Sequence, residues 1–251
     1  MIRRFSISWL GLAVVVLLVA LPGMAHAQSV NIDLGGDAGG GSTAARVIQL
    51  ILLMTVLSLA PGILLMVTSF TRIAVVLSML RQAIGTNTTP PNMVILSLAM
   101  FLTFFVMTPT FERSWNDGIS PLINEQITEA EALERAAKPF HDFMMNNVNE
   151  KDLSLFVDMA KVPQGTAPDA LPYQALIPAF MISELRRAFE IGFLLYLPFI
   201  IIDMVVASVL MSMGMMMLPP VMLALPFKLI FFVLIDGWYL ISGSLVQSFQ
   251  P

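Results

Sequence analysis

The stretch MSMGMMMLPP at residues 211–220 closes a long apolar segment, and five of its first seven residues are methionine. Methionine side chains are unbranched and polarisable, so they fill irregular gaps and repack after displacement. Gly214 lowers helix propensity, and Pro219 and Pro220 cannot continue a hydrogen-bonded helix. The pattern predicts a long helix that ends at a sharp turn. Its methionines are either ordinary packing at a helix end, which composition alone favours, or a deformable plug.

The composition is typical of an integral membrane protein. The chain has 251 residues, of which 57% are hydrophobic and 12% charged, whereas soluble domains contain about 25% charged residues. A net charge of −4 without a basic patch excludes nucleic acid as a partner. The chain has no cysteine and two histidines, which excludes disulfides, a thiol nucleophile and a multi-histidine metal centre. We therefore expect no metal and no cofactor.

Residues 1–27 have the pattern of a cleavable signal peptide. Two arginines precede a short apolar core, and Ala25-His26-Ala27 predicts cleavage between Ala27 and Gln28. An uncleaved anchor is the alternative, but the core is shorter than the about 20 apolar residues that a membrane span needs. Residues 28–46 are rich in glycine and polar residues and predict a flexible periplasmic linker.

Residues 47–111 predict a first pair of hydrophobic helices. The first is expected to be kinked at Pro61-Gly62. Arg72 follows an uncharged run of 25 residues. Its guanidinium either extends to a membrane interface or pairs with an acidic group inside an assembly.

Residues 112–175 predict an acidic, mainly helical periplasmic region. Residues 112–173 carry 11 acidic and 5 basic side chains, and helices are expected over about 125–138 and 149–159. The carboxylates form no constellation suited to catalysis. We therefore predict that the chain is not an enzyme.

Residues 176–251 predict a second pair of hydrophobic helices that carries few charges. Glu184 and Arg187 have the i, i+3 spacing of a pair that neutralises itself on one helix, and Arg186 and Glu190 have the i, i+4 spacing. We expect this pairing to leave the apolar surroundings without a net charge at that turn.

A hairpin about Pro219-Pro220 would place Asp203 and Asp236 equally far from the turn, at about 25 Å. Lys228 would lie only half as far, beyond contact with either acid. Because a buried charge is costly without a partner, we predict that Lys228 pairs with another helix pair or another subunit. The charges therefore indicate an oligomer.

The predicted topology has four spans. Cleavage of the leader leaves the mature N-terminus outside the cytoplasm, and four spans return the C-terminus to the same side. The short connection that carries Arg72 and Arg81 and the Pro219-Pro220 turn then lie in the cytoplasm, which fits the positive-inside preference.

Four segments together resemble the FliP family of flagellar type III secretion export-gate proteins, the counterpart of the SctR-type injectisome proteins. The segments are FTRIAVVLSMLRQAIG at 70–85, PPNMVILSLAMFLTFFVMTP at 90–109, IPAFMISELRRAFEIGFLLYLPFIIIDMVVASVLMSMGMMMLPP at 177–220 and LPFKLIFFVLIDGWYLISGSLVQSF at 225–249.

The resemblance implies an all-α membrane protein whose long kinked hairpins pack side by side in a ring-like helical gate. It implies a pentamer that joins FliQ-like and FliR-like subunits above FlhA-like and FlhB-like components. The gate would lie in the flagellar basal body at the bacterial inner membrane and would pass unfolded rod, hook and filament subunits. The positions that match its methionine gasket are Met215, Met216 and Met217, flanked here by Met211 and Met213.

Two other functions remain open from the sequence. An injectisome gate subunit would differ in its substrates, although the leader and the acidic region favour the flagellar branch. An ion or solute transporter would use the intramembrane charges as a relay, but the chain lacks a recognisable pair of inverted repeats. No motif of an intramembrane enzyme or a phosphate loop occurs.

Overall fold

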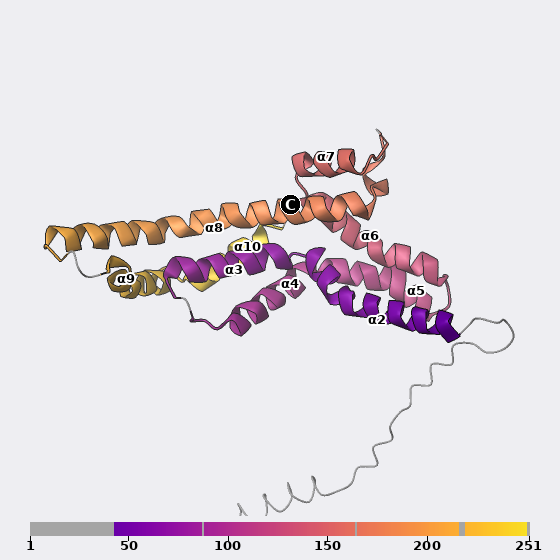
Figure 1. The fold of residues 1–251 in the computed structure, drawn as a ribbon, viewed down its shortest axis with the longest axis horizontal. Coiled ribbons are helices and arrows are strands. Elements are labelled where there is room, and N and C mark those ends of the chain that lie inside the picture. Colours follow the sequence, from indigo (N-terminus) through magenta and orange to yellow (C-terminus); the bar gives the residue numbers. More distant parts are fainter. Residues whose placement is uncertain (1–42, 87, 164, 216–218, 250–251) are drawn as a thin grey trace, which may run out of the picture. The chain divides into compact units, whose positions relative to one another are not determined.

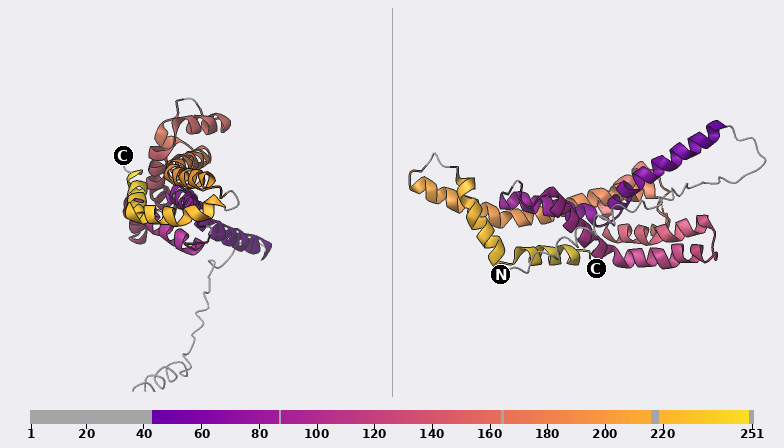
Figure 2. Two further views of the ribbon diagram at one scale, coloured as in Figure 1. Left: turned by 90° about the vertical axis from the view of Figure 1, so that its left-hand side faces the viewer. Right: turned by 90° about the horizontal axis from the view of Figure 1, so that it is seen from below.

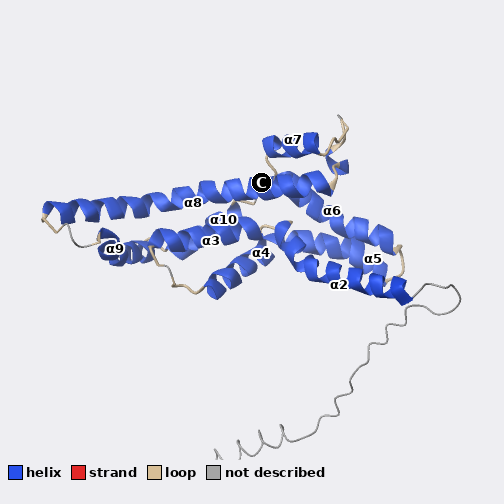
Figure 3. Cartoon of the chain, in the orientation of Figure 1, coloured by secondary structure: helices blue, strands red, loops and turns tan. Residues whose placement is uncertain are grey.

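Every element that the structure describes is helical. The computed structural model describes residues 43–86, 88–163, 165–215 and 219–249, and no strand occurs in these ranges (Figure 3). This confirms the predicted all-α class, while a ring assembly stays a prediction. The signal peptide, its cleavage site between Ala27 and Gln28 and nearly all of the linker lie outside the described residues.

Residues 52–251 form one compact unit. Its helices in chain order are the end of α2 (Thr43–Met66), α3 (Phe70–Ile84), α4 (Asn92–Ser114), a π-helical turn (Trp115–Ile119), α5 (Ser120–Ile123), α6 (Glu129–Asn147), α7 (Glu150–Met159), a 3-10 turn (Pro168–Ala170), α8 (Tyr173–Ser212), α9 (Pro220–Leu234) and α10 (Gly237–Gln247). Residues 1–51 form a separate unit, whose described part is the beginning of α2.

Helix α3 is the centre of the larger unit. Its apolar residues recur at helical spacing, and Ile73, Val76, Leu77 and Leu80 are completely buried. It packs against α4, α8 and α9, and it lies beside the 40-residue α8 along much of its length (Figure 1). Among the helices that pack against α8, α3 makes the most extensive contact, and α6, α7 and α9 cover other parts of it.

Two helices that the sequence predicts as continuous are broken. The segment from α2 to α3 bends by 67° at residues 67–69, whereas the sequence predicted the kink at Pro61-Gly62. Thr68 explains the position of the break: its hydroxyl donates to Leu65 O at 3.2 Å and accepts from Phe70 N at 3.4 Å. A side chain that satisfies local backbone groups in this way competes with the helical hydrogen bonds.

The predicted last helix is also two helices, α9 and α10, which meet at a bend of 64° (Figure 2). Asp236 lies in the break with a left-handed backbone φ of 52°. Aspartate tolerates this conformation better than most residues because its short side chain can hydrogen-bond locally.

The acidic region is built on a continuation of α4. α4, the π-helical turn and α5 form one helix over Asn92–Ile123, and α6 packs back against it. The approach is close, because a Cβ atom on Gly118 would lie 2.6 Å from the Cβ of Ala136. Helices α6 and α7 overlap the two that the sequence predicts here, although α6 continues to Asn147.

Two described helices are long and apolar enough to cross a membrane, Asn92–Ile123 and Tyr173–Ser212. The number rises to four if each bent pair, α2 with α3 and α9 with α10, counts as one span. The predicted number of four spans agrees with the second count, while the orientation of the spans stays a prediction.

Candidate functional site

The described methionines of the stretch, Met211, Met213 and Met215, lie at the end of a helical hairpin formed by α8 and α9. Helix α8 ends at Ser212, and Gly214 follows with a φ of 75°. The amide of Gly214 donates to Met211 O, and the amide of Met215 donates to Leu210 O, both at 3.1 Å. These two bonds and the left-handed glycine define a Schellman C-cap. The helix therefore ends at Ser212, before Gly214 and earlier than the prolines at which the sequence placed the turn.

The prolines instead begin the next helix. Pro219 is the N-cap of α9 and Pro220 its first residue, a position where the missing amide proton costs no helical hydrogen bond. Met213–Met215 and Pro219 are the described residues between the two helices, and none of them is helical. Met216 and Met217 lie outside the described residues.

The described methionines between α8 and α9 and in the last turn of α8 are exposed in the isolated chain. Met211, Met213 and Met215 have 59%, 64% and 36% of their surface exposed. We call these three residues the methionine tip. They present polarisable apolar surface that nothing else in the described chain covers.

Behind the tip, Lys228 of α9 forms an ion pair with Asp203 of α8. Lys228 Nζ lies 2.6 Å from Asp203 Oδ2 and also donates to Ala83 O, at the end of α3, at 3.2 Å. Lys228 is 3% exposed. The prediction that Asp203 lies beyond the reach of Lys228 is therefore wrong, whereas the bond to Ala83 O agrees with the prediction of a partner on another helix pair. Because α8 ends early, Asp203 and Lys228 lie nearly equally far from their helix ends, about 12–14 Å at 1.5 Å per residue.

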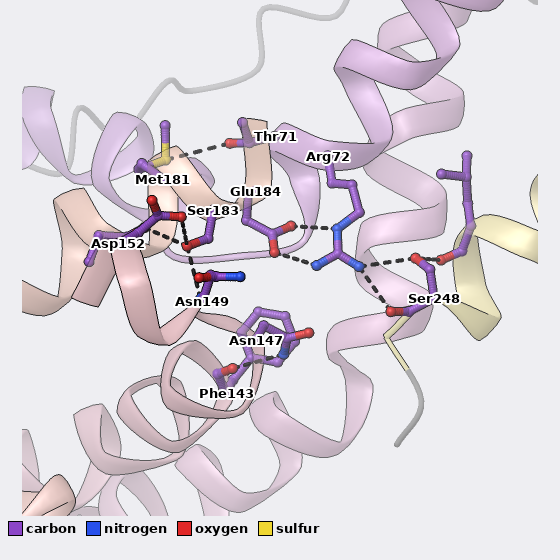
Figure 4. A network of polar contacts seen from close by, with 12 residues as sticks. Thr71, Arg72, Phe143, Asn147, Asn149, Asp152, Met181, Ser183, Glu184 and Ser248 are labelled. Atoms are coloured by element: carbon purple, nitrogen blue, oxygen red, sulfur yellow. Dashed lines mark hydrogen bonds and ion pairs between the residues drawn. The ribbon is translucent and has the colours of Figure 1, made fainter. Parts of the chain in front are cut away.

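A second ion pair joins the opposite half of α8 to α3. Arg72 Nε donates to Glu184 Oε2 at 2.8 Å, and Arg72 Nη2 donates to Glu184 Oε1 (Figure 4). Both residues are completely buried. The sequence left two alternatives for Arg72, extension to a membrane interface or pairing with an acidic group. In the structure Arg72 pairs with an acidic group, and that group belongs to the same chain. Glu184 faces Arg72 across the helix interface, and no ion pair joins it to Arg187 among the described residues.

The C-terminal segment completes the surroundings of Arg72. Arg72 Nη1 donates to the backbone oxygen and the hydroxyl of Ser248 at 2.9 and 3.1 Å, and the guanidinium lies 3.7 Å from the centre of the Phe249 ring. Such a cation–π contact adds to the charge-assisted bonds. Sequence reasoning missed both residues, because Ser248 lies 176 positions from Arg72 and no local spacing indicates such a contact.

A third polar network attaches α7 to α8. Arg186 Nη2 donates to Asp152 Oδ1 at 2.6 Å, and Ser183 Oγ lies 2.9 Å from Asp152 Oδ2. Ser183 Oγ also accepts from the amide of Asn149 at 3.0 Å (Figure 4). Arg186 thus pairs with the acidic region, whereas the sequence assigned it to Glu190.

Two of the predicted intramembrane charges have no ionic partner in the described chain. Arg187 and Asp236 are both exposed, and no ion pair includes either of them among the described residues. The described residues also contain no group of acidic or histidine side chains that could hold a metal ion. The described candidate site therefore consists of ion pairs that join helices and of the exposed methionine tip.

The comparison with known proteins identifies the family from the sequence. The FliP family model matches residues 53–245, which include the tip and both buried ion pairs. The chain belongs to the FliP family. It is 60% identical to the flagellar biosynthetic protein FliP of Caulobacter vibrioides over 92% of this chain and 86% of that protein. The FliP proteins of Agrobacterium fabrum and Bacillus subtilis are each 53% identical, over 95% and 88% of this chain and over 98% and 99% of their own lengths.

Membership confirms the resemblance that four segments of the sequence indicated. The FliP match also covers every residue of the methionine stretch, including those outside the described ranges. The relatives carry a flagellar name, which favours the flagellar branch over the injectisome alternative.

Proposed function

We propose that this FliP-family chain is a subunit of the flagellar type III protein export gate. In this proposal it forms, with FliQ-like and FliR-like subunits, the channel through which unfolded rod, hook and filament proteins cross the inner membrane. It needs no catalytic residue of its own. The observation that carries the proposal is the family match over residues 53–245, supported by helices apolar enough to cross a membrane.

The methionine tip supports a sealing role within this proposal. A conduit for unfolded chains must pass side chains of many sizes and still exclude water and ions when no chain is present. Exposed thioethers at the end of a hairpin suit both needs, because they are apolar and repack around a passing chain. Separation of such side chains gives up dispersion contacts that the passing chain partly restores. In a pentamer, five copies of Met215, Met216 and Met217 would surround the narrowest point.

The test removes the thioethers of the three predicted gasket positions in the assembled gate. The chain is coexpressed with its FliQ-like and FliR-like partners, with Met215 of the tip and the adjacent Met216 and Met217 all replaced by alanine. This triple substitution is called the tip variant. We expect the variant to assemble and the ion leak across the inner membrane to rise. The matched control replaces the exposed residues Met93, Met100 and Met159, which removes the same number of thioethers away from the tip.

Two results would contradict the proposal. An unchanged leak in a fully assembled tip variant would remove the sealing role. Failure of the wild-type chain to copurify with FliQ-like and FliR-like subunits would remove the gate itself.

A further inference from the structure

We infer that Lys228 is a positioning residue that fixes the height of the methionine tip, so that its contacts determine how tightly an idle gate is closed. The inference rests on the proposed gate function and deepens it. Lys228, Asp203 and the carbonyl oxygen of Ala83 together are called the Lys228 clip. It is built from three different helices, α9, α8 and α3.

The clip joins these helices at one atom. Lys228 Nζ donates to Asp203 Oδ2 at 2.6 Å and to Ala83 O at 3.2 Å. The two helices that carry the tip are therefore bonded to each other and to the buried central helix at the same place. Between the clip and the tip, no other ion pair joins α8 to α9 among the described residues.

The end of α3 is shaped to receive the ammonium group. Gly85 caps α3 with a φ of 89°, and its amide donates to Gln82 O at 3.0 Å. Ala83 O, the next carbonyl oxygen of this last turn, accepts from Lys228. A Cβ atom on Gly85 would lie 4.0 Å from Lys228 Nζ. A cation at a helix C-terminus is favoured by the helix dipole and by the unpaired carbonyl groups there.

The clip allows only one register of α9 along α8. A slip by one helical turn would move Lys228 by about 5.4 Å along the helix axis. Asp203 and Ala83 O would then be out of reach, and a buried ammonium group would lose both partners. Because an unpaired buried charge is strongly unfavourable, the register shown in the structure is selected over its neighbours. The apolar side chains that surround the pair impose no comparable selection, since one apolar contact can replace another.

Register determines tip height because the clip lies close to the tip. Only eight residues separate Lys228 from the start of α9 at Pro220, and nine separate Asp203 from the end of α8 at Ser212. Both segments are helical and therefore transmit an axial shift without absorbing it. A hairpin with a loose register would place its methionines at a variable height, and a ring of such hairpins would not close.

The decisive variant distinguishes an effect of the buried charges on folding from an effect of the clip on tip height. Asp203→Leu combined with Lys228→Met removes both charges and keeps similar side-chain volumes, and such replacement of a buried ion pair is often neutral for stability. We expect the gate to assemble at the wild-type level. We also expect its leak to rise at least about tenfold, which corresponds to about 1.4 kcal/mol of lost preference for the closed state. A role confined to folding would leave the leak of each assembled gate unchanged.

The conservative variant Asp203→Asn gives a second readout. Its amide oxygen can still accept from Lys228, so we expect a leak between those of the wild type and the double variant. The control is Asp236→Asn, which changes an exposed acid on the same hairpin that has no ion pair in the described chain. We expect a wild-type leak from it.

The outcomes distinguish this inference from the proposed function. If the double variant assembles with a wild-type leak while the tip variant leaks, the clip does not position the tip but the gate function stands. If neither leaks, the sealing function itself is wrong. Should the double variant fail to assemble, a wild-type leak from Asp203→Asn overturns the inference and an intermediate leak supports it.

Discussion

The two halves of α8 differ in charge and in burial. Residues 173–192, the basal half, contain four of the five charged side chains of the helix, and residues 193–212, the distal half, contain Asp203 alone. Most of the buried residues of α8 lie between Ala175 and Gly192, while Phe199 and Leu210 are the buried residues of the rest of the described helix. The basal half is held by the fully satisfied Arg72–Glu184 pair and by the network around Asp152. The distal half is held by one ion pair, whose Asp203 is 30% exposed and has one buried oxygen without a hydrogen-bond partner.

This difference indicates that the two halves of α8 have different roles, one in the fold of the chain and the other in contacts with other subunits. The basal half is joined to α3 and α7 by ion pairs within one chain and exposes few large apolar residues, such as Ile182 and Phe189. The distal half exposes large apolar residues such as Phe193, Ile201 and Met204. In the proposed assembly these residues would be covered by other subunits, which explains why one helix combines a satisfied base with an unsatisfied end.

The largest effect is expected where the basal half is most buried. Glu184→Ala leaves the Arg72 guanidinium buried without its carboxylate, and removal of one partner from a buried pair costs about 3–5 kcal/mol. We expect a corresponding loss in the free energy of unfolding, measured by denaturing-detergent titration of the purified chain. Glu190→Ala on the exposed face of α8 is the control. A loss in Glu184→Ala no larger than the control's would show that the basal half is not the rigid part.

The sequence predicted the helices better than their joints. The apolar spacing of Ile73, Val76 and Leu77 is helical where α3 lies, and such periodicity is a local property that the sequence shows directly. Arg72 and Glu184 are 112 positions apart, and their contact depends on how α3 packs against α8. Spacing within one helix therefore suggested Arg187 as the partner of Glu184, although in the structure Glu184 pairs with Arg72.

The Lys228 clip was missed because the sequence placed the turn between α8 and α9 a few residues too late. The prolines at 219–220 are strong helix breakers, so the turn was placed there. Gly214 ends α8 earlier because a left-handed glycine lets two amides satisfy the last carbonyl oxygens. A shift of several residues at 1.5 Å each exceeds the reach of a hydrogen bond, so Lys228 and Asp203 were judged too far apart.

An intermediate effect is expected at the joint between α7 and the basal half. Asp152→Ala removes the acceptor of Arg186 and a partner of Ser183, and loss of such buried hydrogen bonds costs about 1–3 kcal/mol. Because α7 then loses its polar attachment to α8, we expect faster limited proteolysis between residues 148 and 163. Asp158→Ala on the exposed face of α7 is the control. Equal cleavage rates in the two variants would mean that apolar packing alone holds α7.

The smallest effect is expected at the tip, where the structure is least constrained. Gly214→Ala meets no steric obstacle, since nothing lies within 4 Å of the added Cβ atom, but the φ of 75° strains any residue with a side chain. The left-handed conformation costs about 1–2 kcal/mol for such residues. We expect the C-cap of α8 to loosen and the ion leak of the assembled gate to rise, with little change in the free energy of unfolding.

Gly243→Ala is the matched control, because Gly243 lies inside α10 and its added Cβ atom also meets nothing within 4 Å. Alanine favours a helix over glycine by about 0.5–1 kcal/mol, so this variant should be slightly stabilised and should not leak. If both variants have wild-type leaks, the end of α8 does not control the tip. Tip height would then depend on the Lys228 clip alone, and the contrast between the two halves of α8 would be sharper.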